Sequence, residues 1–267
     1  TPDIIICRSE MPLNRELKDK IAASCGVEKN CVIESLDSAS IYQIPLSFLK
    51  QDILTPIAEN LGFNELKPDM AKWDSLVKRI IAPTNETTIA FVGKYIDLKE
   101  SYKSLTEGII HAGANLDARV NLRWIDSEKI EENNVNELLK DVDGILVAGG
   151  FGERGVLGKM QAIKFARENK IPYLGICLGM QLTCVEFARH VLGFDDANSS
   201  ELNPDTKHPV IDLMRDQIDV EDMGGTLRLG LYPSKLKRGS KAAAAYDNQE
   251  VVQRRHRHHL LPHLAHQ

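Results

Sequence analysis

A Gly-x-Cys-x-Gly turn at residues 175–179 constrains this chain more than any other feature. A short apolar run at residues 171–174 precedes the turn, and a helical pattern follows it directly. A strand, a cramped turn and a helix in this order predict a nucleophile elbow, whose glycines remove side chains that would clash. The turn places Cys177 at a helix start, where backbone N–H groups and the helix dipole favour the thiolate. A small residue packed in an ordinary turn is the alternative, and we predict a cysteine nucleophile.

Composition excludes several partners. The 267 residues allow one large domain or two ordinary ones, and 43% of them are hydrophobic. The net charge of −5 is no electrostatic match for nucleic acid or for an anionic membrane. The sequence also has no apolar run long enough to span a bilayer and no signal-peptide pattern at its start. We therefore expect neither a nucleic-acid partner nor a membrane.

The cysteines and histidines do not form a metal site in the sequence. An odd number of cysteines without a C-x-x-C pair favours free thiols in a reducing compartment, so we predict a cytoplasmic protein. The tail at residues 254–267 holds five of the eight histidines, but without a fixed ligand spacing, so no metal site is predicted. The cysteines are Cys7, Cys25, Cys31, Cys177 and Cys184.

Strand and helix patterns alternate in two blocks. Residues 1–63 form the first block, residues 64–86 a linker, and residues 87–267 the second block. This alternation predicts an α/β fold with a mostly parallel open sheet and helices on both faces. The ligand site of such a sheet lies beyond the carboxyl ends of its strands, where the elbow falls. We expect strands at 3–7, 31–33, 88–93, 120–125 and 144–147, helices at 14–25, 46–61, 70–80, 102–114, 135–139 and 159–169, an elbow helix to about 192, and loops with short strands over 195–240.

A glycine-rich loop follows the strand at 144–147. Gly150, Gly152 and Gly155 fit a dinucleotide-binding G-x-G-x-x-G pattern. That fold needs a carboxylate at the end of the next strand, and Cys177 occupies this place instead. We therefore pair the loop with the elbow: its N–H groups, with that of Leu178, would form an oxyanion hole for attack on a carbonyl carbon. A flexible surface turn is the alternative.

The expected base is missing from the sequence. A cysteine nucleophile usually works with a histidine that a carboxylate orients. No His-x-Glu follows Cys177, no acid follows His208, and His256 and His258 lie in a basic cluster. Cys184 falls on the apolar stripe of the elbow helix, so we expect it in the core. The hydrolytic site is predicted to be half built.

Several motifs resemble one family. Residues 175–181 resemble the nucleophile motif of the class I glutamine amidotransferases. Residues 2–9 and 40–46 resemble the end of the amidoligase domain of the CTP synthases within that family. The similarity runs from residue 1 to about residue 258. The other motifs that carry it are at residues 92–95, 101–104, 149–152, 196–201, 223–230 and 255–258.

This resemblance implies a flavodoxin-like amidotransferase domain preceded by a partial amidoligase domain. It implies that glutamine is hydrolysed at Cys177 and that ammonia converts UTP to CTP with ATP and Mg²⁺, in a GTP-activated tetramer. It also implies a glutamine and oxyanion site at Gly150, Leu178, Gly179, Met180 and Gln181, with Glu201 on the substrate α-amino group and Arg257 completing the pocket. For nucleotide it implies contacts from Lys20 and Ser38.

The departures from the family lead to further expectations. The amidoligase front half is absent, the sequence after His258 differs, and the distal His and Glu are missing. We expect a chain truncated at both ends that holds neither ATP nor Mg²⁺ alone and neither makes CTP nor hydrolyses glutamine at a useful rate. Two alternatives stay open: a stand-alone cysteine hydrolase of small amides, against which residues 1–62 argue, and a non-catalytic pseudoenzyme.

Overall fold

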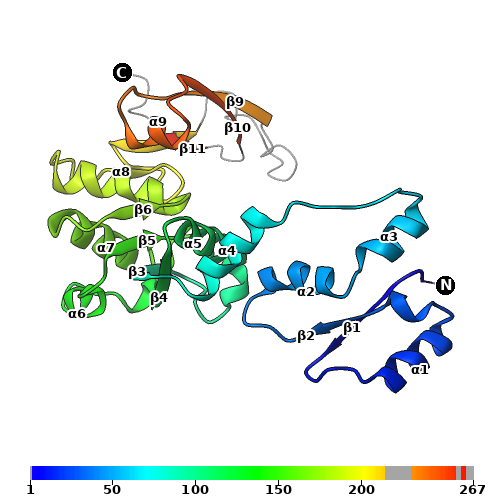
Figure 1. Ribbon diagram of the computed structural model, residues 1–267. Coiled ribbons are helices and arrows are strands. Elements are labelled where there is room, and N and C mark those ends of the chain that lie inside the picture. Colours follow the sequence, from blue (N-terminus) through cyan, green and yellow to red (C-terminus); the bar gives the residue numbers. More distant parts are fainter. Residues whose placement is uncertain (1, 214–229, 257–259, 263–267) are drawn as a thin grey trace. The chain divides into compact units, whose positions relative to one another are not determined.

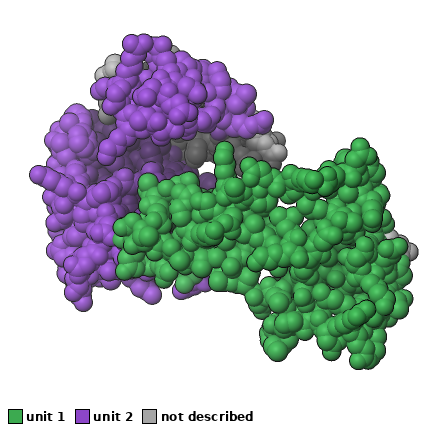
Figure 2. All heavy atoms as spheres, in the orientation of Figure 1, with its two compact units in different colours: residues 1–87, 99–121 green, residues 88–98, 122–267 purple. Residues whose placement is uncertain are grey.

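The computed structural model describes residues 2–213, 230–256 and 260–262 (Figure 1). The chain divides into two compact units (Figure 2). The first unit contains residues 1–87 and 99–121, and the second contains residues 88–98 and 122–267. The domain boundaries expected from the sequence stay predictions.

The first unit begins with two parallel strands, β1 (Ile5–Ser9) and β2 (Val32–Leu36), joined through helix α1 (Arg15–Cys25). Asn14 caps α1, because its side chain accepts a hydrogen bond from the N–H of Leu17 at 2.8 Å. Gly26 ends the helix in the left-handed conformation, with φ 69°. The helix predicted for residues 14–25 is confirmed.

The single helix expected at residues 46–61 is wrong, since the structure has two helices there. They are α2 (Ile44–Lys50) and α3 (Leu54–Leu61). Asp52, with φ 57°, lies between them and cannot continue a right-handed helix. Gln51 fixes the break, because its amide bonds both the N–H and the carbonyl of Glu34 on β2, at 3.0 and 2.8 Å. Helix α4 (Ala71–Ile81) then packs against α5 (Lys103–Asn115).

The central sheet has the strand order β4-β3-β5-β6. Its pairs β3–β5 and β5–β6 are parallel. All four residues of β5 are buried, so both faces of the sheet are covered at its centre. The predicted α/β class is therefore confirmed. The strands are β3 (Asn85–Gly93), β4 (Ala118–Asp126), β5 (Gly144–Val147) and β6 (Tyr173–Gly175).

Three helices of the second unit accompany this sheet: α6 (Val135–Leu139), α7 (Val156–Glu168) and α8 (Leu178–His190). Helix α7 packs against α8 and β5, and α8 packs against β6 (Figure 1). Helix α7 begins three residues before the expected start at residue 159. Lys159 therefore lies in its first turn and is buried.

The remaining described residues of the second unit form short strands and one short helix. The strands at residues 198–199, 209–213 and 230–235 fit the loops with short strands that the sequence predicted for residues 195–240. One sheet has the order β11-β8-β7, and β9 pairs with β10 in antiparallel orientation. No helix in the described ranges is long and apolar enough to cross a membrane. The elements are β7 (Asn198–Ser199), β8 (Pro209–Leu213), β9 (Gly230–Lys235), α9 (Lys241–Ala245), β10 (Val251–His256) and β11 (Leu260–Pro262).

Candidate active site

Three parallel strands of the second unit bring polar residues to one edge of the sheet. Lys94 follows β3, a glycine-rich loop at residues 148–155 follows β5, and Cys177 follows β6. Strand β5 lies between β3 and β6, so its loop is flanked by the other two segments. The chain passes from β3 to β4 on one side and then to β5 on the other, which makes this edge a topological switch point where ligands bind.

Cys177 has the strained backbone of a nucleophile elbow. Its φ of 55° and ψ of −114° lie outside the regions that side-chain-bearing residues prefer, and it is the N-terminal cap of α8. The N–H of Ile176 donates to the carbonyl of Val147 at 3.0 Å, which fastens the turn to β5. The side chain is half-buried. The strand, turn and helix predicted around Cys177 are confirmed, and its nucleophilic role stays a prediction.

The two glycines that flank the cysteine are required by close backbone approach. A Cβ at Gly179 would lie 2.1 Å from the carbonyl oxygen of Val147, and one at Gly175 would lie 2.6 Å from the carbonyl of Gly179. Tyr173 and Thr183 hold the same carbonyl of Gly179, donating to it at 2.9 and 2.8 Å. The first turn of α8 is therefore pressed onto the sheet and fixed there.

The glycine-rich loop lies directly beside the cysteine. A Cβ built on Gly149 would be 3.1 Å from the Cβ of Cys177 and 3.6 Å from its Sγ. Gly150 follows with φ 156°, and a Cβ on it would be 3.6 Å from the Nζ of Lys159. The structure therefore brings this loop and the elbow together, as the sequence predicted.

Two buried lysines hold the loop from beneath. Lys159 is fully buried, at 0% exposure, and its Nζ donates to the carbonyls of Ala148 and Gly149 at 2.7 and 3.2 Å. Lys94 is 5% exposed, and its Nζ donates to the carbonyls of Phe151 and Gly152 at 2.6 and 2.7 Å. Four carbonyls of the five-residue segment 148–152 therefore bind an ammonium group.

Burial changes the protonation of both lysines. It lowers the pKa of Lys159 to about 8, and the neighbouring charge of Lys94 adds to that shift. The charge of a Cys177 thiolate acts in the opposite direction, raising the pKa of Lys159. Burial also lowers the pKa of Lys94, with a further contribution from Arg154.

Some backbone N–H groups around Cys177 donate to backbone carbonyls, and others do not. Those of Gly179, Met180 and Gln181 donate within the elbow, to the carbonyls of Ile176 and Cys177 at 3.0–3.1 Å. Among the described residues, no backbone carbonyl accepts from Gly149, Gly150 or Leu178. Gly150 and Leu178 thus have the free amides that the predicted oxyanion role needs. The glutamine-binding roles of the other elbow residues stay predictions.

Four further residues were predicted to bind substrate or nucleotide: Glu201, Arg257, Lys20 and Ser38. Glu201 is exposed in the turn after β7, and its N–H donates to Ser199 Oγ at 3.3 Å. Arg257 lies outside the described residues. In the first unit, Lys20 forms an exposed ion pair with Glu16 at 2.7 Å, and Ser38 Oγ donates to the carbonyl of Ser40 at 3.1 Å. The nucleotide roles of Lys20 and Ser38 stay predictions.

His208 has an acidic partner that the sequence-based search overlooked. The search considered only acids after the histidine, whereas Asp196 precedes it by twelve residues and bonds its Nδ1. The bond lowers the pKa of the Asp196 carboxyl, and the imidazole also stacks on Phe194 at 4.7 Å. This exposed pair closes the loop between β7 and β8.

The other cysteines and the acidic groups give no second site. Cys184 packs against the core, as predicted, and burial raises the pKa of its thiol. All five cysteines are thiols without a disulfide. Within the described ranges, no three His, Cys, Asp or Glu side chains are close enough to hold a metal ion.

Sequence reasoning missed Lys94 and Lys159. Lys94 entered the sequence analysis only within the motif at residues 92–95, and Lys159 only as the start of an expected helix. One signal could have found them. Lys94 directly follows the buried end of β3, and Lys159 lies between the buried residues Gly158 and Met160 in the first turn of α7. A lysine at such a place must have buried acceptors.

Two family models match the chain. The one described as "Glutamine amidotransferase class-I" matches residues 97–263. The one described as "CTP synthase N-terminus" matches residues 1–63.

Similar proteins include bacterial enzymes and one solved domain. CTP synthase of Campylobacter jejuni subsp. jejuni serotype O:23/36 (strain 81-176) is 63% identical over 97% of this chain and 49% of the relative. That of Wolinella succinogenes is 57% identical over 97% and 48%. A structure titled "Trypanosoma brucei CTPS - glutaminase domain with bound acivicin" is 38% identical with a TM-score of 0.61, covering 67% of this chain and 69% of that chain. The chain spans about half the length of the curated relatives it matches.

Proposed function

The chain belongs to the class I glutamine amidotransferase family and, within it, to the CTP synthases, and on this premise we propose that it carries the glutaminase half of such an enzyme. The single observation that supports this most is the elbow cysteine beside a loop with free amides. The Sγ of Cys177 lies near Gly149, and the N–H groups of Gly150 and Leu178 have no backbone acceptor among the described residues.

The chemistry follows from this geometry. The Cys177 thiolate attacks the side-chain amide carbon of glutamine, and the carbonyl oxygen becomes an oxyanion that Gly150 and Leu178 stabilise. The C–N bond then breaks, and ammonia leaves with the proton that the thiol gave up. Water hydrolyses the remaining thioester to glutamate and regenerates the thiol. In this proposal Glu201 binds the substrate α-amino group, Arg257 completes the pocket, and Gly179, Met180 and Gln181 line it.

The activity of the whole protein is part of the same proposal. It uses the ammonia, with UTP, ATP and Mg²⁺, to form CTP, with GTP as activator and a cytoplasmic tetramer as the assembly. Lys20 and Ser38 would contact nucleotide. Among the described residues, no cluster of donor side chains fits a metal ion. We propose that acivicin, which the neighbour's title names as bound to it, binds this chain beside Cys177.

One experiment tests the function in the full-length gene product. Cys177→Ala should abolish CTP formation from glutamine but leave CTP formation from added ammonium salts, because only the ammonia source is lost. Cys184→Ala, on the same helix, is the matched control and should keep both. Loss of neither reaction in Cys177→Ala would contradict the proposed nucleophile, and a protein that forms no CTP from either source would favour the stand-alone hydrolase or the pseudoenzyme.

A further inference from the structure

We propose that Lys159 and Lys94 are positioning residues, which turn the amides of the loop at residues 148–152 toward the carbonyl oxygen of the bound amide. The inference rests on the proposed function, because it concerns how that oxyanion hole is built. Neither lysine touches the substrate in this account. Each acts through the peptide groups that it holds.

The first step is the direction of the carbonyls. Lys159 takes those of Ala148 and Gly149, and Lys94 takes those of Phe151 and Gly152, all within 3.2 Å. Both ammonium groups are buried, so water cannot compete for these bonds. The loop is therefore fixed at both ends.

The second step is the direction of the amides. Every peptide bond in the described ranges is trans, and in a trans peptide the N–H points away from its carbonyl. Binding of the Ala148 and Gly149 carbonyls to Lys159 thus turns the N–H groups of Gly149 and Gly150 to the opposite side. Successive amides turned to one side form a concavity that binds an anion. Gly149 is also the loop residue whose Cα faces the Sγ of Cys177.

The third step concerns the free-energy cost of burying two ammonium groups. Replacing a buried charge by an apolar side chain of similar volume is often neutral or stabilising, so stability alone does not explain two buried ammonium groups. Both ammonium groups are buried, and burial disfavours the charged form of a lysine. The two lysines must therefore serve something other than stability, and fixing the loop is the role that their contacts support.

The test uses two reagents that differ in their need for an oxyanion hole. The nitrile analogue of glutamine, 2-amino-4-cyanobutanoate, adds the Cys177 sulfur to its nitrile carbon. One C–N π bond breaks, the thiol proton moves to nitrogen, and that nitrogen occupies the oxyanion position. Iodoacetamide instead forms an S–C bond at its methylene carbon and expels iodide, with no atom in the hole.

Lys159→Met should weaken nitrile binding by about tenfold or more beyond any fall in the alkylation rate of Cys177, since loss of one oxyanion donor costs about 10²–10³ in rate. Lys164→Met, which removes the same charge from the same helix, should leave both unchanged. An equal fall in both reactions, or no fall in either, would overturn the inference. Lys94→Met tests the second clamp in the same way and is expected to act in the same direction.

If neither lysine variant folds, an NMR measurement on the wild-type chain tests the inference. The ¹⁵N amide resonances of Gly149 and Gly150 should shift when the nitrile binds, and unmoved resonances in a bound sample would overturn the inference. The failure of the proposed function is distinguishable. A wild-type chain that does not bind the nitrile at all refutes that function and this inference with it, whereas unchanged nitrile binding in both lysine variants refutes the inference alone.

Discussion

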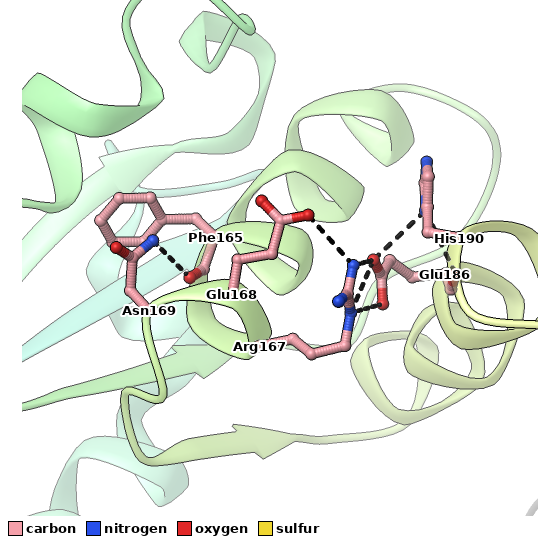
Figure 3. A network of polar contacts seen from close by, with 6 residues as sticks. All are labelled: Phe165, Arg167, Glu168, Asn169, Glu186 and His190. Carbon is pink, nitrogen blue, oxygen red and sulfur yellow. Dashed lines mark hydrogen bonds and ion pairs between the residues drawn. The ribbon is translucent and has the colours of Figure 1, made fainter.

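A buried ion pair joins helix α7 to helix α8. It predicts both the direction and the size of the change in unfolding free energy when either partner is replaced. Arg167 on α7 donates to both carboxylate oxygens of Glu186 on α8, at distances of 2.8–3.2 Å (Figure 3). His190 lies 3.2 Å from the same carboxylate, and Glu168 lies 3.3 Å from the guanidinium. The side chain of Glu186 is 1% exposed, whereas that of Arg167 is 31% exposed.

Because of this difference in exposure, we expect the two single substitutions to lower the unfolding free energy by different amounts. Arg167→Met leaves a buried carboxylate without its main partner, which costs about 3–5 kcal/mol of unfolding free energy. Glu186→Gln leaves a guanidinium that still reaches water and Glu168, so we expect about 1–2 kcal/mol. The double variant Arg167→Met with Glu186→Leu should be more stable than Arg167→Met alone, because no buried charge remains.

Urea unfolding with tryptophan fluorescence measures these values. Trp124 packs against Phe91 in the second unit, with ring centroids 4.4 Å apart and ring planes inclined by 37°, and Trp73 lies in the first unit. A Trp73→Phe background therefore reports the second unit alone. If Glu186→Gln cost as much as Arg167→Met, the argument from exposure would be refuted, and so it would be if the double variant were the least stable of the three.

Three further predictions concern the elbow and the lysine beneath it. Gly179→Ala should destabilise the second unit by about 3 kcal/mol in the same urea assay, because its Cβ meets the Val147 carbonyl. Gly108→Ala, with open space on α5 in the first unit, should stabilise that unit by about 0.5–1 kcal/mol, measured in the protein that keeps Trp73. The pKa of Lys159 falls from 10.5 to about 8 on folding, so the unfolded chain binds more protons between these values. Between about pH 8 and pH 10.5, the free energy of unfolding of the wild-type chain should rise by up to about 3 kcal/mol relative to that of Lys159→Met. If the unfolding free energies of the two proteins changed in parallel with pH, this prediction would be contradicted. Tyr173→Phe removes one of two donors to the Gly179 carbonyl and should cost about 1 kcal/mol, and a loss as large as that of Gly179→Ala would show another role.

Local sequence patterns predicted the elements of the second unit well. The helix α6 and the strand β5 have the bounds expected from the sequence. Strand β5 is a short apolar run that ends before a pair of glycines, so its bounds are visible in the sequence. The elbow was predictable for a related reason: only glycine permits the backbone approach seen at residues 175 and 179. Such signals are local in the chain.

Features that depend on tertiary contacts were not predicted from the sequence. The break between α2 and α3 depends on Gln51 reaching Glu34, seventeen residues away. The partner of His208 was missed because Asp196 precedes it across a loop. The hydrogen bonds from Lys94 and Lys159 to the loop were not predicted, because these residues come together only when three strands lie side by side in the folded sheet.

Selective labelling of the cysteines tests the central claim most directly. The chain is treated with a glutamine-derived diazoketone, and the modification of each of the five cysteines is followed by peptide mass spectrometry with and without free glutamine. The account predicts that Cys177 is labelled ahead of Cys7, Cys25, Cys31 and Cys184, and that glutamine slows its labelling alone. Equal labelling of all five thiols, or labelling of Cys177 that glutamine does not slow, would contradict a glutaminase nucleophile at the elbow.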